Sequence, residues 1–200
     1  NGGIVSFKSD PTVDRDLQFP ISKHKVEKTL ARKLINKVQK WYALKSKKNE
    51  EKKIAIVLSS YPGRDFQLAH ALGLDTIRST THILHFLRKH GFKFSQPDLF
   101  FEKLKKSKIE IPITLYDKLL NDVPLKLRAE LFKTWGSFED DVLFENDKFV
   151  LHGYKDGNFF VLVQPSRGLI EDKKDDYHNL AKPPCHSYVA LYLWLQTQNI

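Results

Sequence analysis

Apolar residues recur at every third or fourth position in the first quarter of the chain, which is the spacing of one face of a helix. The residues of this stripe are Val26, Leu30, Leu34, Val38 and Tyr42. Ser22 is a residue type that caps helices, so the pattern predicts an amphipathic helix from about residue 22 to about residue 44. Residues 1–20 carry Gly and Pro breakers, and we expect them to be irregular.

The chain then runs through five consecutive apolar residues, without the alternation of a half-buried strand. This run predicts a strand over 53–59 that is covered on both faces and lies centrally in a mostly parallel sheet. A polar loop follows at 60–74. Beyond it a helix is predicted over 75–90, with Asp75 as its N-cap and Gly91 in the left-handed position after its end.

Shorter apolar patterns predict two helical stretches, then two strands joined by a turn, then a last helix that is apolar nearly all round and therefore buried. These elements cover 97–106, 114–134, 149–151, 159–163 and 187–198. The fold class predicted is α/β, with a mostly parallel sheet flanked by helices. Residues 1–50 are expected to form an irregular segment and a connecting helix, and residues 51–200 to form the α/β domain.

The net charge of +9 comes mainly from lysines, which cluster at 45–53 and 103–108. Neither cluster interleaves aromatic residues with Arg, the residue that reads bases in pairs of hydrogen bonds. We therefore interpret both clusters as solvated surface and expect no nucleic-acid partner. The positive field is compatible with a polyanionic small molecule as ligand.

Composition also bears on location. The sequence has no Met, a single cysteine (Cys185), no apolar run long enough to cross a membrane and no signal-peptide pattern. One cysteine cannot form an internal disulfide, which suits a reducing compartment. These features favour an excised piece of a larger, cytoplasmic protein without a membrane partner.

Two motifs are more specific than any of these patterns. The first reads Tyr61-Pro62-Gly63-Arg64-Asp65, then Gly73-Leu74-Asp75-Thr76. The second reads Gln164-Pro165-Ser166-Arg167-Gly168, then Tyr177-His178, then Pro183-Pro184-Cys185-His186-Ser187-Tyr188. With Trp135-Gly136 between them, they resemble the large (CobN) subunit of cobaltochelatase, which is similar to the H subunit of magnesium chelatase. The resemblance runs from about Lys53 to Leu195.

The resemblance implies that the whole protein inserts cobalt into a corrin precursor in cobalamin biosynthesis. It also implies that a corrinoid or porphyrin-like macrocycle binds this chain, and that partner AAA+ subunits hydrolyse ATP. The sequence has no G-x-x-x-x-G-K-[ST] loop, so we expect this chain to bind no ATP and no other cofactor. A porphyrin-binding subunit of magnesium-chelatase type and a non-catalytic α/β binding or scaffold module remain as alternatives.

The catalytic residues are not assigned. In the family a G-K-H-G-x-x-E-W motif, with its His and Glu, would follow soon after Ile200. The α/β domain is therefore expected to be incomplete at its C-terminal end.

Arginines follow two of the predicted strands. Arg64 and Asp65 follow strand 53–59, and Arg167 follows strand 159–163 with Gln164, so both arginines could meet at one rim of the sheet. A guanidinium group binds the carboxylates or amides at the edge of a macrocycle through two parallel donors. The alternatives are an Arg–Asp pair that braces a turn and a solvated loop arginine.

His178 and His186 match the family pattern, and a neutral imidazole can accept a pyrrole proton. Their spacing is not that of a metal site, so we predict no metal ligands, and a structural histidine is the alternative for each. Asp75 is favoured as an N-cap over a ligand contact. The predicted substrate-binding residues are Arg64, Asp65, Asp75, Gln164, Arg167, His178 and His186.

Overall fold

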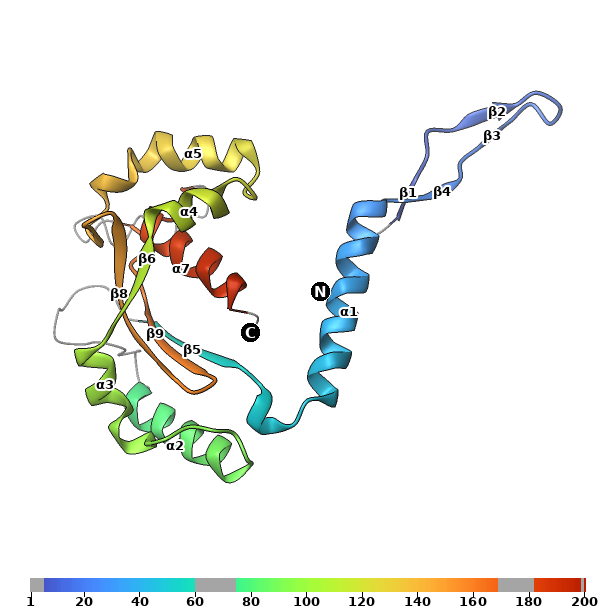
Figure 1. The fold of residues 1–200 in the computed structure, drawn as a ribbon. Helices are drawn as coiled ribbons and strands as arrows, with labels where there is room; N and C mark the ends of the chain where they lie inside the picture. Colours follow the sequence, from blue (N-terminus) through green and yellow to red (C-terminus); the bar gives the residue numbers. More distant parts are fainter. Residues whose placement is uncertain (1–5, 60–74, 169–181, 199) are drawn as a thin grey trace. The chain divides into compact units, whose positions relative to one another are not determined.

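The computed structural model describes residues 6–59, 75–168, 182–198 and 200 (Figure 1). Among these, no helix is long and apolar enough to cross a membrane. The chain divides into two compact units, Asn1–Lys48 and Asn49–Ile200.

The first unit consists of paired strands and one long helix. Strand β1 (Ser6–Lys8) pairs with β4 (His24–Val26), and β2 (Thr12–Asp14) pairs with β3 (Phe19–Ile21), both antiparallel. Helix α1 spans Lys28–Ser46. The expected irregular segment and the helix start near residue 22 are therefore wrong. Pairing extends the backbone through Val26, and the Glu27 side chain, rather than that of Ser22, caps the helix by accepting from the N–H of Leu30.

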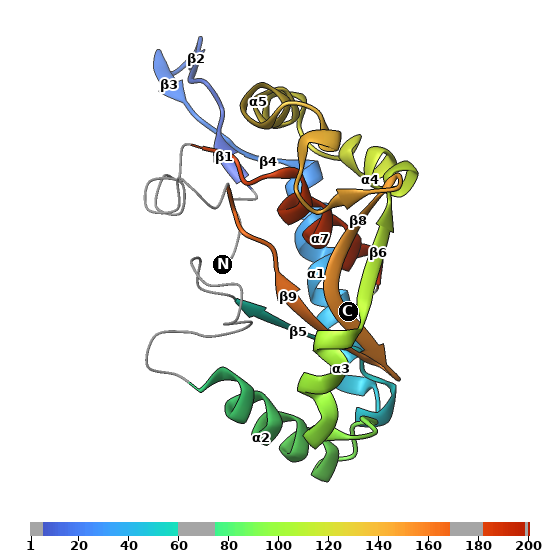
Figure 2. The same cartoon turned by 90° about the vertical axis from the view of Figure 1, so that its left-hand side faces the viewer.

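The second unit is built around a five-stranded mixed sheet in the order β5-β9-β8-β6, with β7 also paired to β8 (Figure 2). The strands are β5 (Ile54–Ser59), β6 (Lys108–Pro112), β7 (Phe144–Glu145), β8 (Lys148–Asp156) and β9 (Phe159–Gln164). Only β5 and β9 are parallel among the described pairs. The sheet is thus not mostly parallel, because the turn at Gly157-Asn158 joins β8 directly to β9 and so short a connection requires antiparallel strands.

Strand β5 lies at the end of the described strand order rather than at its centre. Its side chains nevertheless face apolar cores on both sides: Ile54 and Ile56 pack on one core, and Ala55 and Val57 on the other. The prediction that both faces are covered is confirmed. The central position is wrong, because an unbroken apolar run reports which faces are covered and not how many neighbouring strands a strand has.

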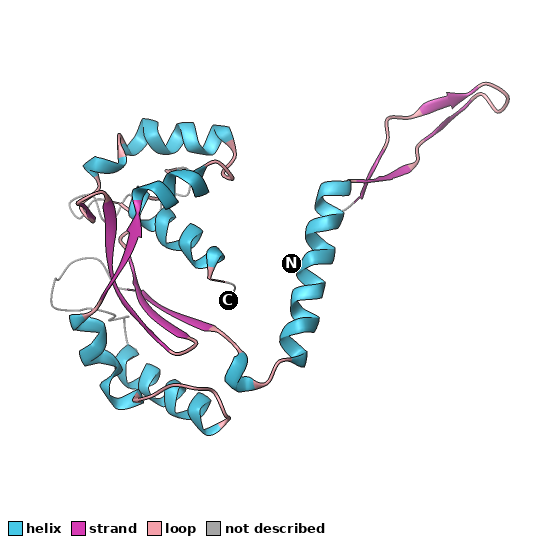
Figure 3. Cartoon of the chain, viewed as in Figure 1, coloured by secondary structure: helices cyan, strands magenta, loops and turns pink. Residues whose placement is uncertain are grey.

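Helices cover both faces of the sheet, so the predicted α/β class with flanking helices is confirmed (Figures 1 and 3). Helices α2 (Thr76–Lys89) and α3 (Phe100–Lys106) enclose one core, which contains Leu84, Phe100 and Phe159. On the other face, α4 (Ile113–Leu120), α5 (Leu125–Trp135) and α7 (His186–Thr197) enclose the second core around Tyr116 and Leu162. Short 3-10 turns at Asn49–Glu51, Pro97–Leu99 and Phe138–Asp140 complete the described elements.

Helix α2 has the predicted ends. Asp75 accepts a hydrogen bond from the backbone N–H of Arg78 at 2.9 Å, and Gly91 has a φ of +84°. Asp75 is therefore an N-cap, as predicted.

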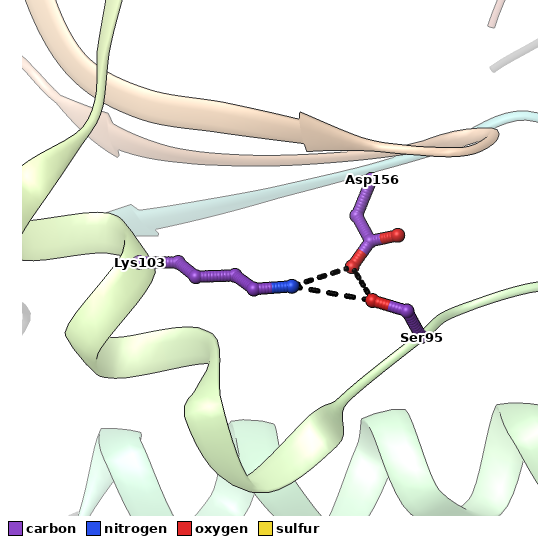
Figure 4. A network of polar contacts seen from close by, with 3 residues as sticks. All are labelled: Ser95, Lys103 and Asp156. Atoms are coloured by element: carbon purple, nitrogen blue, oxygen red, sulfur yellow. Dashed lines mark hydrogen bonds and ion pairs between the residues drawn. The ribbon is translucent and has the colours of Figure 1, made fainter.

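A polar network fixes α3 against the end of β8 (Figure 4). Lys103 Nζ lies 3.2 Å from Asp156 Oδ2, and the Ser95 hydroxyl donates to the same oxygen at 2.5 Å. The Asp156 side chain is only 15% exposed, so this ion pair is better shielded from solvent than an ordinary surface pair. The network stabilises the fold, and none of its three residues lines the cavity beside Trp135.

Candidate functional site

A cavity of about 270 Å³ lies where the segment after β9 meets the N-terminal end of α7. Its described lining residues come from the end of α5, the acidic turn that follows, and both flanks of residues 169–181. They are Thr134, Trp135, Asp140, Asp141, Val142, Gly168, Lys182 and Cys185. The cavity thus brings together two parts of the second motif and the Trp135-Gly136 pair.

Arg167 joins the two flanks of this cavity. Its Nη2 donates to the carbonyl of Lys182 at 2.9 Å, and its own carbonyl accepts from the N–H of Cys185 at 2.9 Å. Its buried Nε atom has no hydrogen-bond partner among the described residues. A buried donor without a partner is costly, although Arg167 itself is not among the residues that line the cavity.

Trp135 forms an aromatic wall of the cavity. The indole Nε1 donates to the carbonyl of Pro183 at 2.8 Å, which fixes the ring. Lys182 Nζ lies 4.4 Å from the centre of the same ring, within the range of a cation–π interaction. The wall therefore combines a flat apolar surface with a positive charge.

His186 is buried behind the cavity, with 1% of its surface exposed. Its Nε2 lies 3.2 Å from the carbonyl oxygen of Gly136, which can only accept, so Nε2 carries the proton. Its Nδ1 then accepts from the Tyr116 hydroxyl at 2.9 Å. Burial lowers the pKa of His186, although the Gly136 carbonyl opposes this shift, and burial raises the pKa of Tyr116. Both groups are therefore held neutral.

Asp141 fixes the start of α7. One carboxylate oxygen accepts from the N–H of Ser187 at 2.8 Å, and the other accepts from the N–H of Leu143 at 3.0 Å. A carboxylate at the first turn of a helix is favoured by the helix dipole. Asp140 likewise accepts from the N–H of Ser137 at 2.9 Å. Both carboxylates are thus anchored by backbone groups.

Cys185 does not have the surroundings of a nucleophile. Its Sγ donates to the carbonyl of Ser166 at 3.1 Å, and burial, with a further contribution from Asp141, raises the pKa of the thiol. A reactive cysteine needs the opposite shift. Within the described ranges no group of three His, Cys, Asp or Glu residues could hold a metal ion.

The structure brings together only some of the predicted site residues. Arg167 and His186 lie around the cavity, and Asp75 caps α2. Gln164 ends β9 directly beside Ser59, the last residue of β5. Arg64, Asp65 and His178 lie outside the described residues. Contact between any of these residues and a macrocycle stays a prediction.

Sequence reasoning missed several residues that shape the cavity. Tyr116, Asp141 and Lys182 lie far apart in the sequence, and no local spacing connects them. The only sequence feature that pointed toward one of these residues was the acidic stretch after Trp135-Gly136, which contains Asp141.

Comparison with known proteins gives matches over nearly the whole chain. The family model of CobN/Magnesium Chelatase matches residues 3–199. The uncharacterized protein MJ0908 of Methanocaldococcus jannaschii is 31% identical over 219 residues, covering 98% of this chain and 18% of that protein. The aerobic cobaltochelatase subunit CobN of a Sinorhizobium species is 26% identical over 209 residues. That match covers 97% of this chain and 16% of the CobN subunit.

The fold has a counterpart among solved structures. The catalytic subunit of cobaltochelatase from Mycobacterium tuberculosis superposes with a TM-score of 0.74 at 22% identity. The match covers 96% of this chain and 17% of that one. This chain thus spans less than a fifth of the length of these relatives.

Proposed function

Because the chain belongs to the CobN/magnesium chelatase family, we propose that it forms part of the macrocycle-binding large subunit of an ATP-dependent metal chelatase. We further propose cobalt as the metal substrate and a corrin precursor as the macrocycle, in cobalamin biosynthesis in the cytoplasm. The observation that carries this proposal is the family match over residues 3–199. The proposal of cobalt is supported by the similarity to a protein named as a CobN subunit.

The cavity beside Trp135 has a size and chemistry that fit the edge of such a macrocycle. Its volume of about 270 Å³ is below the range of roughly 300–1,000 Å³ that holds a whole drug-sized ligand. It is therefore suited to one peripheral carboxylate or amide group rather than to the ring. Lys182 lines the cavity and supplies positive charge, and we propose that the unpaired Nε–H of Arg167, next to the lining residue Gly168, becomes a donor to this group when the ligand binds.

The parallel register supports a second contact. Ser59 and Gln164 are paired, so the carboxyl ends of β5 and β9 lie at the same edge of the sheet. In the sequence, Arg64 comes after β5 and Arg167 after β9. Ligands in open α/β sheets bind at this edge. We propose that Arg64, Asp65 and His178 also contact the macrocycle.

Metal insertion requires removal of two pyrrole protons and of the water bound to the metal. His186 already uses both ring nitrogens for Gly136 and Tyr116, so its role in this proposal is to position α7 rather than to accept a proton. The base and the metal-binding groups are proposed to come from sequence beyond this chain. ATP hydrolysis is assigned to partner AAA+ subunits, since the sequence has no phosphate-binding loop.

Fluorescence titration of the chain with a metal-free corrin that carries carboxylate and amide groups tests the proposal. We expect saturable quenching, weakened about tenfold or more by Arg167→Ala, the scale of a lost hydrogen bond to a charged group. Arg128→Ala is the matched control, because Arg128, on α5, donates to Asn121 after α4 and makes no contact with the residues that line the cavity. A metal-free porphyrin that binds more tightly than the corrin would favour the magnesium-chelatase alternative. Absence of binding to both macrocycles would favour a non-catalytic module.

A further inference from the structure

Strand β5 ends the described order of the sheet without the features that protect an edge strand (Figure 2). Edge strands in natural proteins carry charged side chains or proline, which prevent pairing with a further strand. At the other end of the order, β6 has this protection in Lys108, Glu110 and Pro112. The residues of β5, Ile54–Ser59, include no charged residue and no proline. The side chains of β6 are therefore those of an edge strand, and the side chains of β5 are not.

The connection from β5 to β6 sets one direction across the sheet. β6 is antiparallel to β8, β8 is antiparallel to β9, and β9 is parallel to β5, so β6 runs in the same direction as β5. The helices of this connection, α2 and α3, pack in the first core through Leu84 and Phe100. Connections between parallel strands of one sheet are almost always right-handed. A right-handed connection over this face carries the chain from the β5 end of the order toward the β6 end.

Helix α7 follows β9 on the opposite face. Its residues Ala190 and Leu191 pack in the second core, together with Ala55 and Val57 of β5. A right-handed connection over this face runs in the opposite direction across the sheet, because the sheet is then viewed from its other side. A parallel strand that follows α7 is therefore displaced from β9 toward β5. Since β5 already occupies the position next to β9, the first position left is the outer edge of β5.

We propose that, in a large subunit that continues past α7, the next segment forms a strand parallel to β5 that pairs with its outer edge. This inference rests on the proposed role of the chain as part of such a subunit. In agreement with that role, the match to MJ0908 covers 98% of this chain but only 18% of that protein. Loops between a helix and the next strand have about 2–6 residues, so the strand is expected to begin within about six residues of Thr197.

The register of β5 identifies the group that the new strand binds. The N–H of Ile54 donates to the Asn158 carbonyl at 3.0 Å, and alternate residues of a parallel strand bond to the same neighbour. The N–H of Ile56 therefore faces β9, and the N–H of Val57 points to the outer edge. Val57 is the donor that pairing with a further strand would engage.

Hydrogen exchange at single-residue resolution tests the proposal. Exchange is measured by mass spectrometry on this chain and on the chain extended by the sequence that follows it in the full-length subunit. The Val57 amide is expected to exchange about a hundredfold or more slowly in the extended chain, because a paired amide exchanges only when the structure opens. The Ile56 amide, which faces β9 in both proteins, is expected to be equally protected in both.

Glu110 is the matched control at the other end of the sheet. Its partner Val150 donates to the Leu143 carbonyl instead, so in this antiparallel pair the N–H of Glu110 points away from β8. We expect the Glu110 amide to exchange rapidly in both proteins. Rapid exchange of Val57 in both would overturn the proposal. Slow exchange of Val57 in the shorter chain would also overturn it, because the edge of β5 would then be covered by another part of residues 1–200.

A proline scan of the extension tests which segment covers the edge. Proline within about ten residues after α7 is expected to return the Val57 amide to the faster rate while Ile56 stays protected, because proline removes a ladder donor. Slow exchange of Val57 in all of these variants would assign the edge to a different segment and overturn the proposal. The measurements involve no macrocycle, metal or ATP. Failure of the strand pairing is therefore distinguishable from failure of the proposed function, which the macrocycle titration tests.

Discussion

The Tyr116 hydroxyl lies 2.9 Å from Nδ1 of His186, and both side chains are buried at 0% and 1% exposure. This bond joins α4 to the first residue of α7. Because the other ring nitrogen of His186 faces the Gly136 carbonyl, the pair also connects α7 to the end of α5. The wall of the cavity thus depends on a hydrogen-bond chain that runs through the second core.

Tyr116→Phe should destabilise the second unit. The change removes the hydroxyl donor and leaves the buried Nδ1 of His186 without a partner, which costs about 1–3 kcal/mol. Urea denaturation of the wild-type chain and the variant measures the difference in the free energy of unfolding. Tyr42→Phe is the control, because Tyr42 is 74% exposed. Equal stability of Tyr116→Phe and Tyr42→Phe would contradict the assigned hydrogen bond.

His186 should make stability depend on pH. Burial lowers its pKa below the ordinary value of 6.5, so the unfolded chain binds a proton more readily than the folded chain. The contribution of neutral His186 to the free energy of unfolding is therefore complete above about pH 6.5. It is lost as the pH falls through the pKa that His186 has in the folded chain, which is the lower of the two values. Urea denaturation from pH 7.5 to pH 5 should show this loss in the wild-type chain and a smaller loss in His186→Gln. Parallel pH profiles for the two proteins would refute it.

Cys185 should react slowly with thiol reagents. Burial raises the pKa of its thiol, and the thiolate is the reactive form. Because Cys185 is the only cysteine, the rate of reaction with a chromogenic disulfide reports on this site alone. At pH 8 we expect a rate well below that of the same chain unfolded in urea. A rate in the folded chain equal to or above the unfolded rate would indicate an activated thiol instead.

The sequence predicted best where a local signal decides the structure. The ends of α2 follow from Asp75 and Gly91, whose preferences act within one turn of helix. The turn at Gly157-Asn158 also follows from local composition. The last helix forms as predicted but is only partly buried, because Tyr192, Gln196 and Thr197 are exposed. Gly168 and Cys185 of the second family motif line the cavity, but the contacts of this motif, from Arg167 to Lys182 and from Cys185 to Ser166, already span 15 and 19 residues.

Long-range pairing was not predictable in the same way. Strand β6 (108–112) was missed, because its backbone hydrogen bonds are made with the antiparallel strand β8, which begins only at Lys148. The pairing of β1 with β4 likewise shortened the expected first helix. Asp141 could not be assigned, since its partner Ser187 lies 46 residues away.

The position of β5 at the end of the described order gives a test at single-residue resolution. Its first N–H, that of Ile54, donates to the Asn158 carbonyl at 3.0 Å. In a parallel ladder alternate residues bond to the same neighbour, so the register directs the N–H groups of Ile56 and Leu58 toward β9. The N–H group of Val57 then points away from β9.

Proline tests this difference, because it removes the N–H and is tolerated in a strand only where that group has no partner. We expect Ile56→Pro to lower the free energy of unfolding by about 1–3 kcal/mol more than Val57→Pro, since it leaves a buried β9 carbonyl unpaired. Urea denaturation of both variants measures the difference, and circular dichroism verifies that each one folds. Equal losses would show that Val57 also donates to a neighbour, and that β5 has a strand on both sides.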